Sequence, residues 1–387
     1  MDQSVSASHS RAAAKSCLPV LLIWMLLGCG GGSPSNGPIS QPQPLPELLF
    51  SATQNGITVF PVNASTGALG TGSQATSAFT SAGFLANMVS DAAGKFLFAY
   101  SPGNSAIEAF SINAKTGALA TIDGSMLPIQ GFGAGNLSID PTGKFLYAAT
   151  SAGVSAFTVN STTGVLSAVA GSPFSDGSSL DQSVIDPSDK FLYALSNTSP
   201  QNTISVFTIN SSNGALNPIV GSPFQLPFGT TYSVALHPSG KFLYISYPQT
   251  EQIAAWSINA SSGTLTIVSG SPFASGAVSG DAPNGLLIAP SGKFLYAWSG
   301  GATFFGFSVD ANSGALSVVN GSPFTLNSAT ADFSIDPSSQ FLYAAYANAN
   351  TVAGFNIDVS TGALTAFTVP PVSAPGVSLL TVVKPSQ

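Results

Sequence analysis

A repeat with a period of about fifty residues runs through most of this 387-residue chain. Its clearest element joins a turn to an apolar strand and recurs as DAAGKFLF (91–98), DPTGKFLY (140–147), DPSDKFLY (186–193), HPSGKFLY (237–244), APSGKFLY (289–296) and DPSSQFLY (336–343). A second element, of the type ISVFTINSSNGALN, carries a glycine at residues 67, 117, 164, 214, 263, 314 and 362, which lie 47 to 51 residues apart. A repeat of this length, built only from strand-like segments, is typical of a β-propeller or a β-solenoid.

Each unit reads as four antiparallel strands. A short strand A leads into a D-P-S-G turn, whose residues occupy the positions that a type I turn favours. The KFLYA segment is strand B, the I-x-x-F-x-I segment is strand C, and N-x-x-T-G turns the chain into strand D, which ends near a recurring GSPF. Strands B and C are apolar on both faces, so each sheet has to be covered on both sides by its neighbours. The pattern therefore predicts a propeller blade.

The two ends of the repeat complete each other. Residues 47–60 supply a strand B and a strand C with no strand A before them, and residues 376–387 supply a strand A and its turn. We therefore expect an all-β, seven-bladed β-propeller with four antiparallel strands per blade. Its C-terminal strand should complete the N-terminal blade and leave no free sheet edge. An open solenoid would not need complementary ends.

The N-terminus predicts export. A basic start is followed by the apolar stretch 17–27, which is too short to span a bilayer. The LLGC sequence at residues 26–29 resembles the lipobox of bacterial lipoproteins. This resemblance implies that residues 1–28 are a signal peptide and that Cys29 is acylated. The alternative is an ordinary secretory signal that happens to end near a cysteine.

A lipidated Cys29 would anchor the protein to a membrane through residues 29–46, a tether rich in Gly, Ser and Pro. The propeller would follow at residues 47–387. Because Gly30 replaces the Asp of an inner-membrane retention signal, the predicted location is the outer membrane of the bacterial envelope, on its periplasmic side or its surface.

Composition excludes several classes of function. A net charge of −7 without a basic cluster argues against nucleic acid, whose binding requires Lys and Arg. The only cysteines are Cys17 and Cys29, so the mature body would have no disulfide, cysteine nucleophile or thiolate metal site. No cofactor is expected, and the one ion weighed is Ca²⁺, because Asp, Asn and carbonyl oxygens suit it.

His237 is the single histidine of the propeller sequence, and histidine is a common catalytic acid or base. It occupies the first turn position of its repeat, where four other copies have Asp91, Asp140, Asp186 and Asp336. A side-chain acceptor at that position caps the turn, and an imidazole can replace a carboxylate there. We therefore predict that His237 is a turn residue, which leaves no histidine for a Ser-His-Asp triad.

A ligand site is predicted on the face that carries the B–C and D–A connections, because these differ between copies while the A–B and C–D turns do not. Amides and carboxylates near the start of strand A, with aromatics at the end of strand B, suit a sugar, a small acid or an extended peptide. The alternative is that the amides satisfy loop backbone and the aromatics only pack. The candidates are Asn87, Asn136, Asp181, Gln182, Tyr232, Asn284 and Asp332, with Tyr100, Tyr247, Trp298 and Tyr346.

The D/H-P-x-G-K-x-L-Y register resembles the seven-bladed lactonase-type propellers, which include 6-phosphogluconolactonase-like and YVTN-repeat proteins. The resemblance covers about residues 47–387 and rests on scaffold residues. Lactonase members carry Arg-His five and four residues before the turn Asp of one or more blades. Here those pairs read Ala86-Asn87, Gly135-Asn136, Asp181-Gln182, Tyr232-Ser233, Asn284-Gly285, Ala331-Asp332 and Leu379-Leu380. The resemblance therefore implies the fold, and the family's catalytic residues are not carried over.

Two functions follow from these observations. The first is a lipid-anchored binding or scaffold module that engages a glycan, peptide, protein or small molecule. The second is a divergent lactone hydrolase or cycloisomerase acting on small sugar-acid lactones, with Asp181, Glu251 or Asp332 as the base. Glu108, inside strand C, is expected to be a solvated strand residue because unpaired Glu is seldom buried.

Overall fold

The structure is a computed structural model that describes residues 45–386 except 54–55, 78–84, 125, 132–135, 197–201 and 277–280. The predicted signal peptide and Cys29 lie outside the described residues, as does the tether up to residue 44. The chain divides into residues 1–43 and a compact unit of residues 44–387 that holds all the sheets. Within the described part, no helix has the length and hydropathy needed to cross a bilayer.

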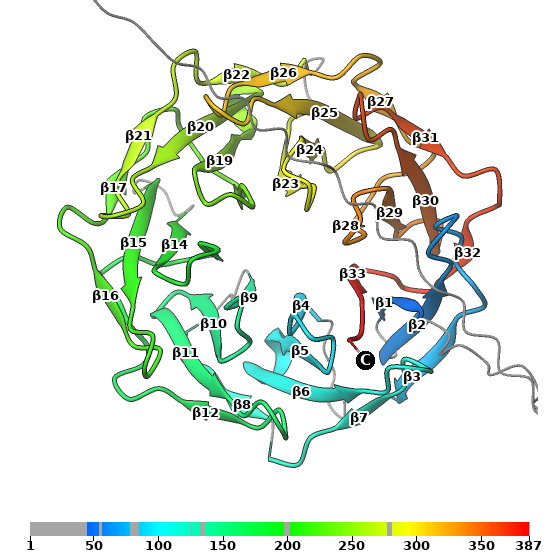
Figure 1. The fold of residues 1–387 in the computed structure, drawn as a ribbon, viewed down its shortest axis with the longest axis horizontal. Helices are drawn as coiled ribbons and strands as arrows, with labels where there is room; N and C mark the ends of the chain where they lie inside the picture. The colour runs from blue at the N-terminus through cyan, green and yellow to red at the C-terminus, as the bar shows by residue number, and fades with distance from the viewer. Residues whose placement is uncertain are drawn as a thin grey trace, which may run out of the picture. The chain divides into compact units, whose positions relative to one another are not determined.

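Seven antiparallel sheets surround a central channel, and each sheet is one blade of a propeller (Figure 1). Within a blade, strands A, B, C and D follow one another outward from the channel, as the repeat predicts. Blade 1 consists of β1 (Glu47–Thr53), β2 (Gly56–Val62) and β3 (Ser73–Ser77) with β33 (Leu379–Val383). Blade 2 consists of β4 (Asn87–Ser90), β5 (Phe96–Ser101), β6 (Ala106–Ile112), β7 (Leu119–Thr121) and β8 (Leu127–Pro128). Blade 3 consists of β9 (Leu137–Ile139), β10 (Phe145–Thr150), β11 (Gly153–Val159) and β12 (Leu166–Ala168).

Blades 4 to 7 share one plan, in which a short fifth strand follows strand D and pairs with strand C. Blade 4 consists of β13 (Gln182–Ile185), β14 (Phe191–Ser196), β15 (Thr203–Ile209), β16 (Leu216–Pro218) and β17 (Phe224–Gln225). Blade 5 consists of β18 (Val234–Leu236), β19 (Phe242–Tyr247), β20 (Gln252–Ile258), β21 (Leu265–Ile267) and β22 (Phe273–Ala274). Blade 6 consists of β23 (Gly285–Ile288), β24 (Phe294–Trp298), β25 (Thr303–Val309), β26 (Leu316–Val318) and β27 (Phe324–Thr325). Blade 7 consists of β28 (Asp332–Ile335), β29 (Phe341–Tyr346), β30 (Thr351–Ile357), β31 (Leu364–Ala366) and β32 (Val372–Ser373).

Only two short helical turns interrupt the strands in the part of the chain that the structure describes. Both are 3-10 turns in B–C connections, η1 (Pro102–Asn104) and η2 (Pro248–Thr250), and both begin with a proline. The fifth strands β8, β17, β22, β27 and β32 add to the four predicted strands; in blades 4 to 6 the recurring GSPF supplies their phenylalanine. Each of these fifth strands bonds strand C beyond the point where strand D leaves it.

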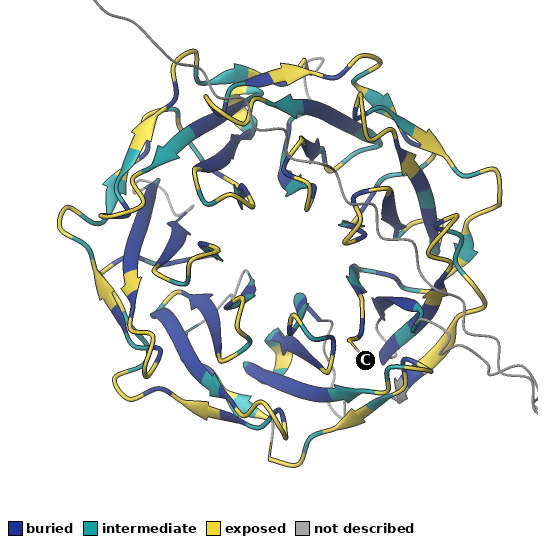
Figure 2. Cartoon of the chain, in the orientation of Figure 1, coloured by how far each residue is buried: buried dark blue, intermediate teal, exposed yellow. Residues whose placement is uncertain are grey.

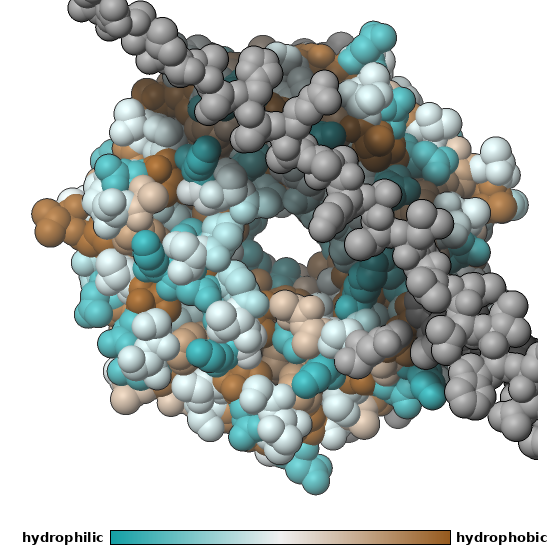
Figure 3. All heavy atoms as spheres, viewed as in Figure 1, coloured by the Kyte–Doolittle hydropathy of each residue, from teal (hydrophilic) through white to brown (hydrophobic). Residues whose placement is uncertain are grey.

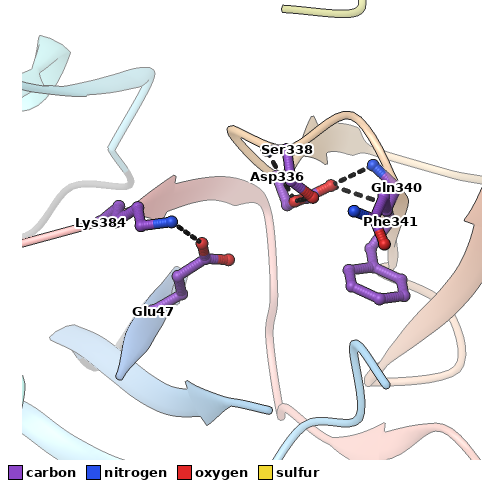
Figure 4. A network of polar contacts seen from close by, with 6 residues as sticks. All are labelled: Glu47, Asp336, Ser338, Gln340, Phe341 and Lys384. Atoms are coloured by element: carbon purple, nitrogen blue, oxygen red, sulfur yellow. Dashed lines mark hydrogen bonds and ion pairs between the residues drawn. The ribbon is translucent and has the colours of Figure 1, made fainter. Parts of the chain in front are cut away.

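The predicted closure of the ring is confirmed. β33 pairs with β1 from Leu48↔Val383 to Ala52↔Leu379, so the C-terminal strand is strand A of blade 1. An ion pair of 3.1 Å between Lys384 and the buried carboxylate of Glu47 joins the same two segments (Figure 4). The inner edge of β1 is therefore covered, as ring closure requires.

The core lies between the blades. Seven clusters of buried apolar side chains each combine two adjacent blades, including the pair formed by blades 7 and 1. The middle strands of each blade are accordingly buried, and the outermost strands are the exposed ones (Figure 2). The two apolar faces of strand B explain this arrangement, because each face packs against a different neighbouring blade.

Tyrosines of strand B link five of the seven blades to the next blade. The hydroxyl of the KFLY tyrosine donates a hydrogen bond to the carbonyl of the C–D turn glycine in the following blade. The bonds are Tyr147 to Gly214 (3.1 Å), Tyr193 to Gly263 (3.2 Å), Tyr244 to Gly314 (3.1 Å), Tyr296 to Gly362 (2.8 Å) and Tyr343 to Gly67 (2.8 Å). Phe50 and Phe98 occupy this position in the other two blades and cannot donate.

The aspartate that opens the A–B turn in four blades caps that turn, as predicted. One carboxylate oxygen of Asp336 accepts hydrogen bonds from the backbone N–H groups of Gln340 (2.8 Å) and Phe341 (2.6 Å), while the other accepts from Ser338 (Figure 4). Asp91, Asp140 and Asp186 make equivalent bonds. These caps bring strand A back into strand B and align the innermost strands along the channel.

Candidate functional site

The innermost strands raise a physical problem, because their inner edges have no further strand to pair with. Five blades solve it with the side chain at one register position of strand A, which accepts a hydrogen bond from a backbone N–H of the next blade. We call these five side chains the inner ties. They are Asn87 to Leu137 (3.0 Å), Asn136 to Ser183 (2.7 Å), Gln182 to Val234 (3.2 Å), Ser233 to Leu286 (3.2 Å) and Asp332 to Leu380 (2.7 Å).

Four predicted ligand residues are thus inner ties. Asn136 and Gln182 use both ends of their amides, since each also donates to a backbone carbonyl of the next blade, at 3.0 Å in both cases. Asn87 and Asp332 each accept a hydrogen bond from a backbone N–H of the next blade. These contacts show that the four side chains hold neighbouring blades together at the channel. Their binding of a ligand stays a prediction.

The predicted aromatic rim is not formed by strand B. Tyr100, Tyr247 and Tyr346 are at most 2% exposed and pack between blades. Trp298 is half-buried, and its ring lies 5.1 Å from that of Phe333 in the next blade. These side chains are buried because a strand inside a propeller has a neighbouring blade on each face, which leaves no bare ring at its end.

Directly before the tie position in six blades, the chain forms a β-bulge in which two residues face one residue of strand B. In blade 5, the N–H of Tyr232 donates to the carbonyl of Ser246 (3.1 Å), and the N–H of Ser246 donates to the carbonyl of Ser233 (3.0 Å). Five other blades show the same bond from the residue before the tie position. A bulge redirects the side chain of its extra residue, and such residues recur beside binding sites. The six bulge residues are Ala86, Asp181, Tyr232, Asn284, Ala331 and Ser378.

The three bulge residues with larger polar or aromatic side chains stand on three consecutive blades. Asp181, Tyr232 and Asn284 belong to blades 4, 5 and 6, and we call them the mouth arc. Tyr232 is the exposed member, with 51% of its surface accessible, while the other two are half-buried. The mouth arc therefore unites three of the predicted residues on one side of the channel, whose opening is visible in Figure 3.

A polar cluster extends the mouth arc on blade 6. The amide nitrogen of Asn284 lies 3.4 Å from the point at which a side chain would begin on Gly300. A carboxylate oxygen of Asp281 and the hydroxyl of Ser299 each lie 3.3 Å from the same point on Gly301. The two glycines leave the backbone bare between these polar groups, and sequence analysis missed Asp281 because its loop carries no repeat motif.

The described lysines of the propeller are confined to one of its two faces. All seven lysines that the structure describes lie in A–B or C–D turns or directly after β33, which we call the turn face: Lys95, Lys115, Lys144, Lys190, Lys241, Lys293 and Lys384. The opposite face, with the B–C and D–A connections, is the loop face and carries Asp181, Glu251 and Asp281. A ligand at the loop face meets carboxylates and no described cation.

His237 lies in the turn face, as predicted. Its Nδ1 accepts the backbone N–H of Ser239 (3.0 Å), and its Nε2 lies 2.9 Å from the carbonyl of Gly292 in the next blade. Burial lowers the pKa of His237, which favours the neutral ring. In that form Nε2–H donates to Gly292 and Nδ1 accepts, so both nitrogens serve the turn.

Among the five inner ties, Asp332 alone has an ionisable side chain. Burial raises its pKa to about 7, although the N–H groups of Leu380 and Phe333 stabilise the carboxylate and act in the opposite direction. A carboxyl that exchanges its proton near neutral pH has the property that a general base requires.

Glu108 is not solvated, and the expectation of an exposed strand residue was wrong. It is 6% exposed on β6, opposite Ala99, and burial raises the pKa of its carboxyl. Its cross-strand partner Ala99 offers no polar group, and burial of the carboxyl favours the neutral form.

No metal centre is evident in the described part of the chain, where no group of three or more His, Cys, Asp or Glu side chains is arranged to hold an ion. The Asp residues of the loop face belong to separate blades. Because Asn side chains and backbone carbonyls are also calcium ligands, the Ca²⁺ weighed from the sequence stays an expectation.

The architecture defines a closed seven-bladed β-propeller with a polar mouth, and the family follows from comparison with known sequences. The model of the family described as "Lactonase, 7-bladed beta-propeller" matches residues 49–175 and 232–380, which is well over half of the chain. The chain belongs to this family. No protein with a curated description matches its sequence.

Solved structures show the same fold. A candidate 6-phosphogluconolactonase from Bacteroides fragilis is 20% identical, with a TM-score of 0.71 over 91% of this chain and 100% of that one. The periplasmic gluconolactonase of Pseudomonas aeruginosa is 17% identical, with a TM-score of 0.71 over 87% of this chain and 99% of that one. At such identities the similarity establishes the fold.

Proposed function

We propose that this lactonase-family propeller is a binding module of the bacterial cell envelope, and that its ligand sits at the channel mouth on the loop face. The observation that carries the proposal is the mouth arc, which places a carboxylate, an exposed phenol and an amide on adjacent blades. The arc and the inner ties occupy the positions at which lactonase members would carry Arg and His. The sequence has no arginine after Arg11 and no histidine there.

Retention of a ligand from a periplasmic extract tests this proposal. The immobilised full chain should retain a compound that mass spectrometry identifies, and Tyr232→Ala should abolish that retention because it removes the exposed ring of the arc. Lys241→Ala, on the turn face, is the matched control and should retain the compound unchanged. Equal retention by Tyr232→Ala, or loss with Lys241→Ala, would contradict the placement of the site.

The proposed location rests on the LLGC sequence at residues 26–29. We expect the chain to take up labelled palmitate in a bacterial host and to fractionate with the outer membrane. Cys29→Ser should abolish the labelling because it removes the acylated thiol. Labelling that persists in this variant would exclude the anchor.

A second function is favoured by one observation at the channel. The pKa of about 7 at Asp332 suits this carboxyl to act as a base in the opening of a sugar-acid lactone. It would take a proton from the water that attacks the carbonyl carbon and return it to the ring oxygen as the ester C–O bond breaks. A pH-stat assay with unphosphorylated aldonolactones would then show a rate that rises with pH through about 7. Asp332→Asn should abolish the turnover, and an unchanged rate in that variant would remove Asp332 from the reaction.

A further inference from the structure

We propose that the mouth arc binds a neutral saccharide, with Tyr232 against the sugar ring and Asp181 and Asn284 bonded to its hydroxyl groups. The inference rests on the proposed binding function and adds the chemical class of the ligand. It is carried by the position, the rigidity and the charge of these three residues.

Position separates the mouth arc from the rest of the ring. The bulge residues of blades 7, 1 and 2 are Ala331, Ser378 and Ala86, which are too small to reach a ligand in the channel. Groups suited to a ligand are therefore concentrated on blades 4 to 6.

The backbone of the arc is held in place from the preceding blades. The amide of Gln182 in blade 4 donates to the carbonyl of Tyr232 (3.0 Å), and the hydroxyl of Ser246 in blade 5 donates to the carbonyl of Asn284 (2.7 Å). Tyr232 is also bonded through its own N–H. A platform fixed before the ligand arrives loses little conformational entropy on binding.

The functional groups match hydroxyl-bearing ligands. A sugar hydroxyl both donates and accepts; Asp181 and Asp281 accept, whereas the amide of Asn284 does both. An exposed tyrosine ring offers an apolar surface to the C–H groups of a pyranose.

Charge decides between ligand classes. A phosphorylated or carboxylated sugar needs cationic partners, and every described lysine lies on the turn face. Like charge from Asp181 and Asp281 would oppose such a ligand. A neutral saccharide avoids this repulsion, and the donor amide of Asn284 favours it over a purely cationic ligand.

Calorimetric titration of the purified full chain tests the assignment. The probes are three neutral trisaccharides (maltotriose, cellotriose and triacetylchitotriose), with trigalacturonate as the acidic counterpart and spermidine as the cationic one. We expect at least one neutral probe to bind. Tyr232→Ala should weaken it by about tenfold or more through loss of the ring contact, which corresponds to about 1.4 kcal/mol. Tyr232→Phe should stay within about threefold because it keeps the ring, and Lys241→Ala should be unchanged.

Three results would overturn the inference. Binding of a neutral probe that is unaffected by Tyr232→Ala, in protein with an unchanged unfolding midpoint, would place the saccharide elsewhere. Binding of spermidine or trigalacturonate alone would assign another ligand class. Failure of all five probes, with retention of an extract compound still lost in Tyr232→Ala, would reject the saccharide while leaving the proposed binding function intact.

Discussion

The bond between Tyr343 and Gly67 joins blade 7 to blade 1, so its removal tests how the ring is held closed. The hydroxyl of Tyr343 is fully buried and lies 2.8 Å from the glycine carbonyl. Tyr343→Phe removes the donor and leaves a buried carbonyl without its partner. A lost hydrogen bond of this kind costs about 1–2 kcal/mol of the free energy of unfolding.

Tyr247 supplies a matched control for the same chemical change. It is also fully buried, but its hydroxyl has no hydrogen-bond partner among the described residues. Tyr247→Phe should therefore leave the free energy of unfolding unchanged or raise it slightly. Phe98 occupies the tyrosine position of blade 2. Phe98→Tyr should therefore raise the free energy of unfolding by about 0.5–1 kcal/mol if the new hydroxyl reaches the carbonyl of Gly164.

Urea unfolding followed by the fluorescence of Trp256 and Trp298 measures all three variants. The expected order of midpoints is Phe98→Tyr above wild type, Tyr247→Phe close to wild type, and Tyr343→Phe below it, with equal slopes. Equal losses for Tyr343→Phe and Tyr247→Phe would refute the reasoning, because the partner of the hydroxyl would then be irrelevant.

Three further predictions concern stability. Because burial raises the pKa of Glu108 in the folded state, the native protein should lose stability as pH rises through that pKa. Glu108→Gln should remove this loss, so its urea midpoint should exceed that of the wild type at pH 8 and not at pH 4. Asp189 has φ of +57° and a pKa raised to about 6 by burial and then by Asp140 and Asp186, so Asp189→Gly should raise thermal stability more at pH 8 than at pH 5. Gly263 has φ of +74°, and a side chain there would begin 2.6 Å from the ring of Phe191. Gly263→Ala should therefore lower the free energy of unfolding in urea by about 2–4 kcal/mol. A change in this free energy smaller than that caused by Asp189→Gly would contradict the close packing.

The repeat was sufficient to predict the ring and its closure. The seven repeated glycines predict seven blades, and the complementary ends predict that β33 pairs with β1. The turn position of His237 followed from the four aspartates of the other copies. These features are local or periodic, so a single sequence contains them.

The mouth could be predicted only in part, because its geometry depends on contacts between blades. Adjacent residues such as Tyr232 and Ser233 look equivalent in sequence, yet a bulge exposes the first and makes the second an inner tie. The aromatic ends of strand B were expected at the rim, but the neighbouring blade buries Tyr247. No periodic signal places Asp281 beside Gly301, because the loop that carries it occurs once.

The central claim is that the loop face at blades 4 to 6 is the binding surface. Its most direct test is in-cell photocrosslinking with a benzophenone amino acid at position 232, compared with the exposed turn-face position of Lys115. We predict a discrete adduct from position 232 that is absent from position 115. An adduct formed from position 115 alone would place the partner on the turn face and contradict the account.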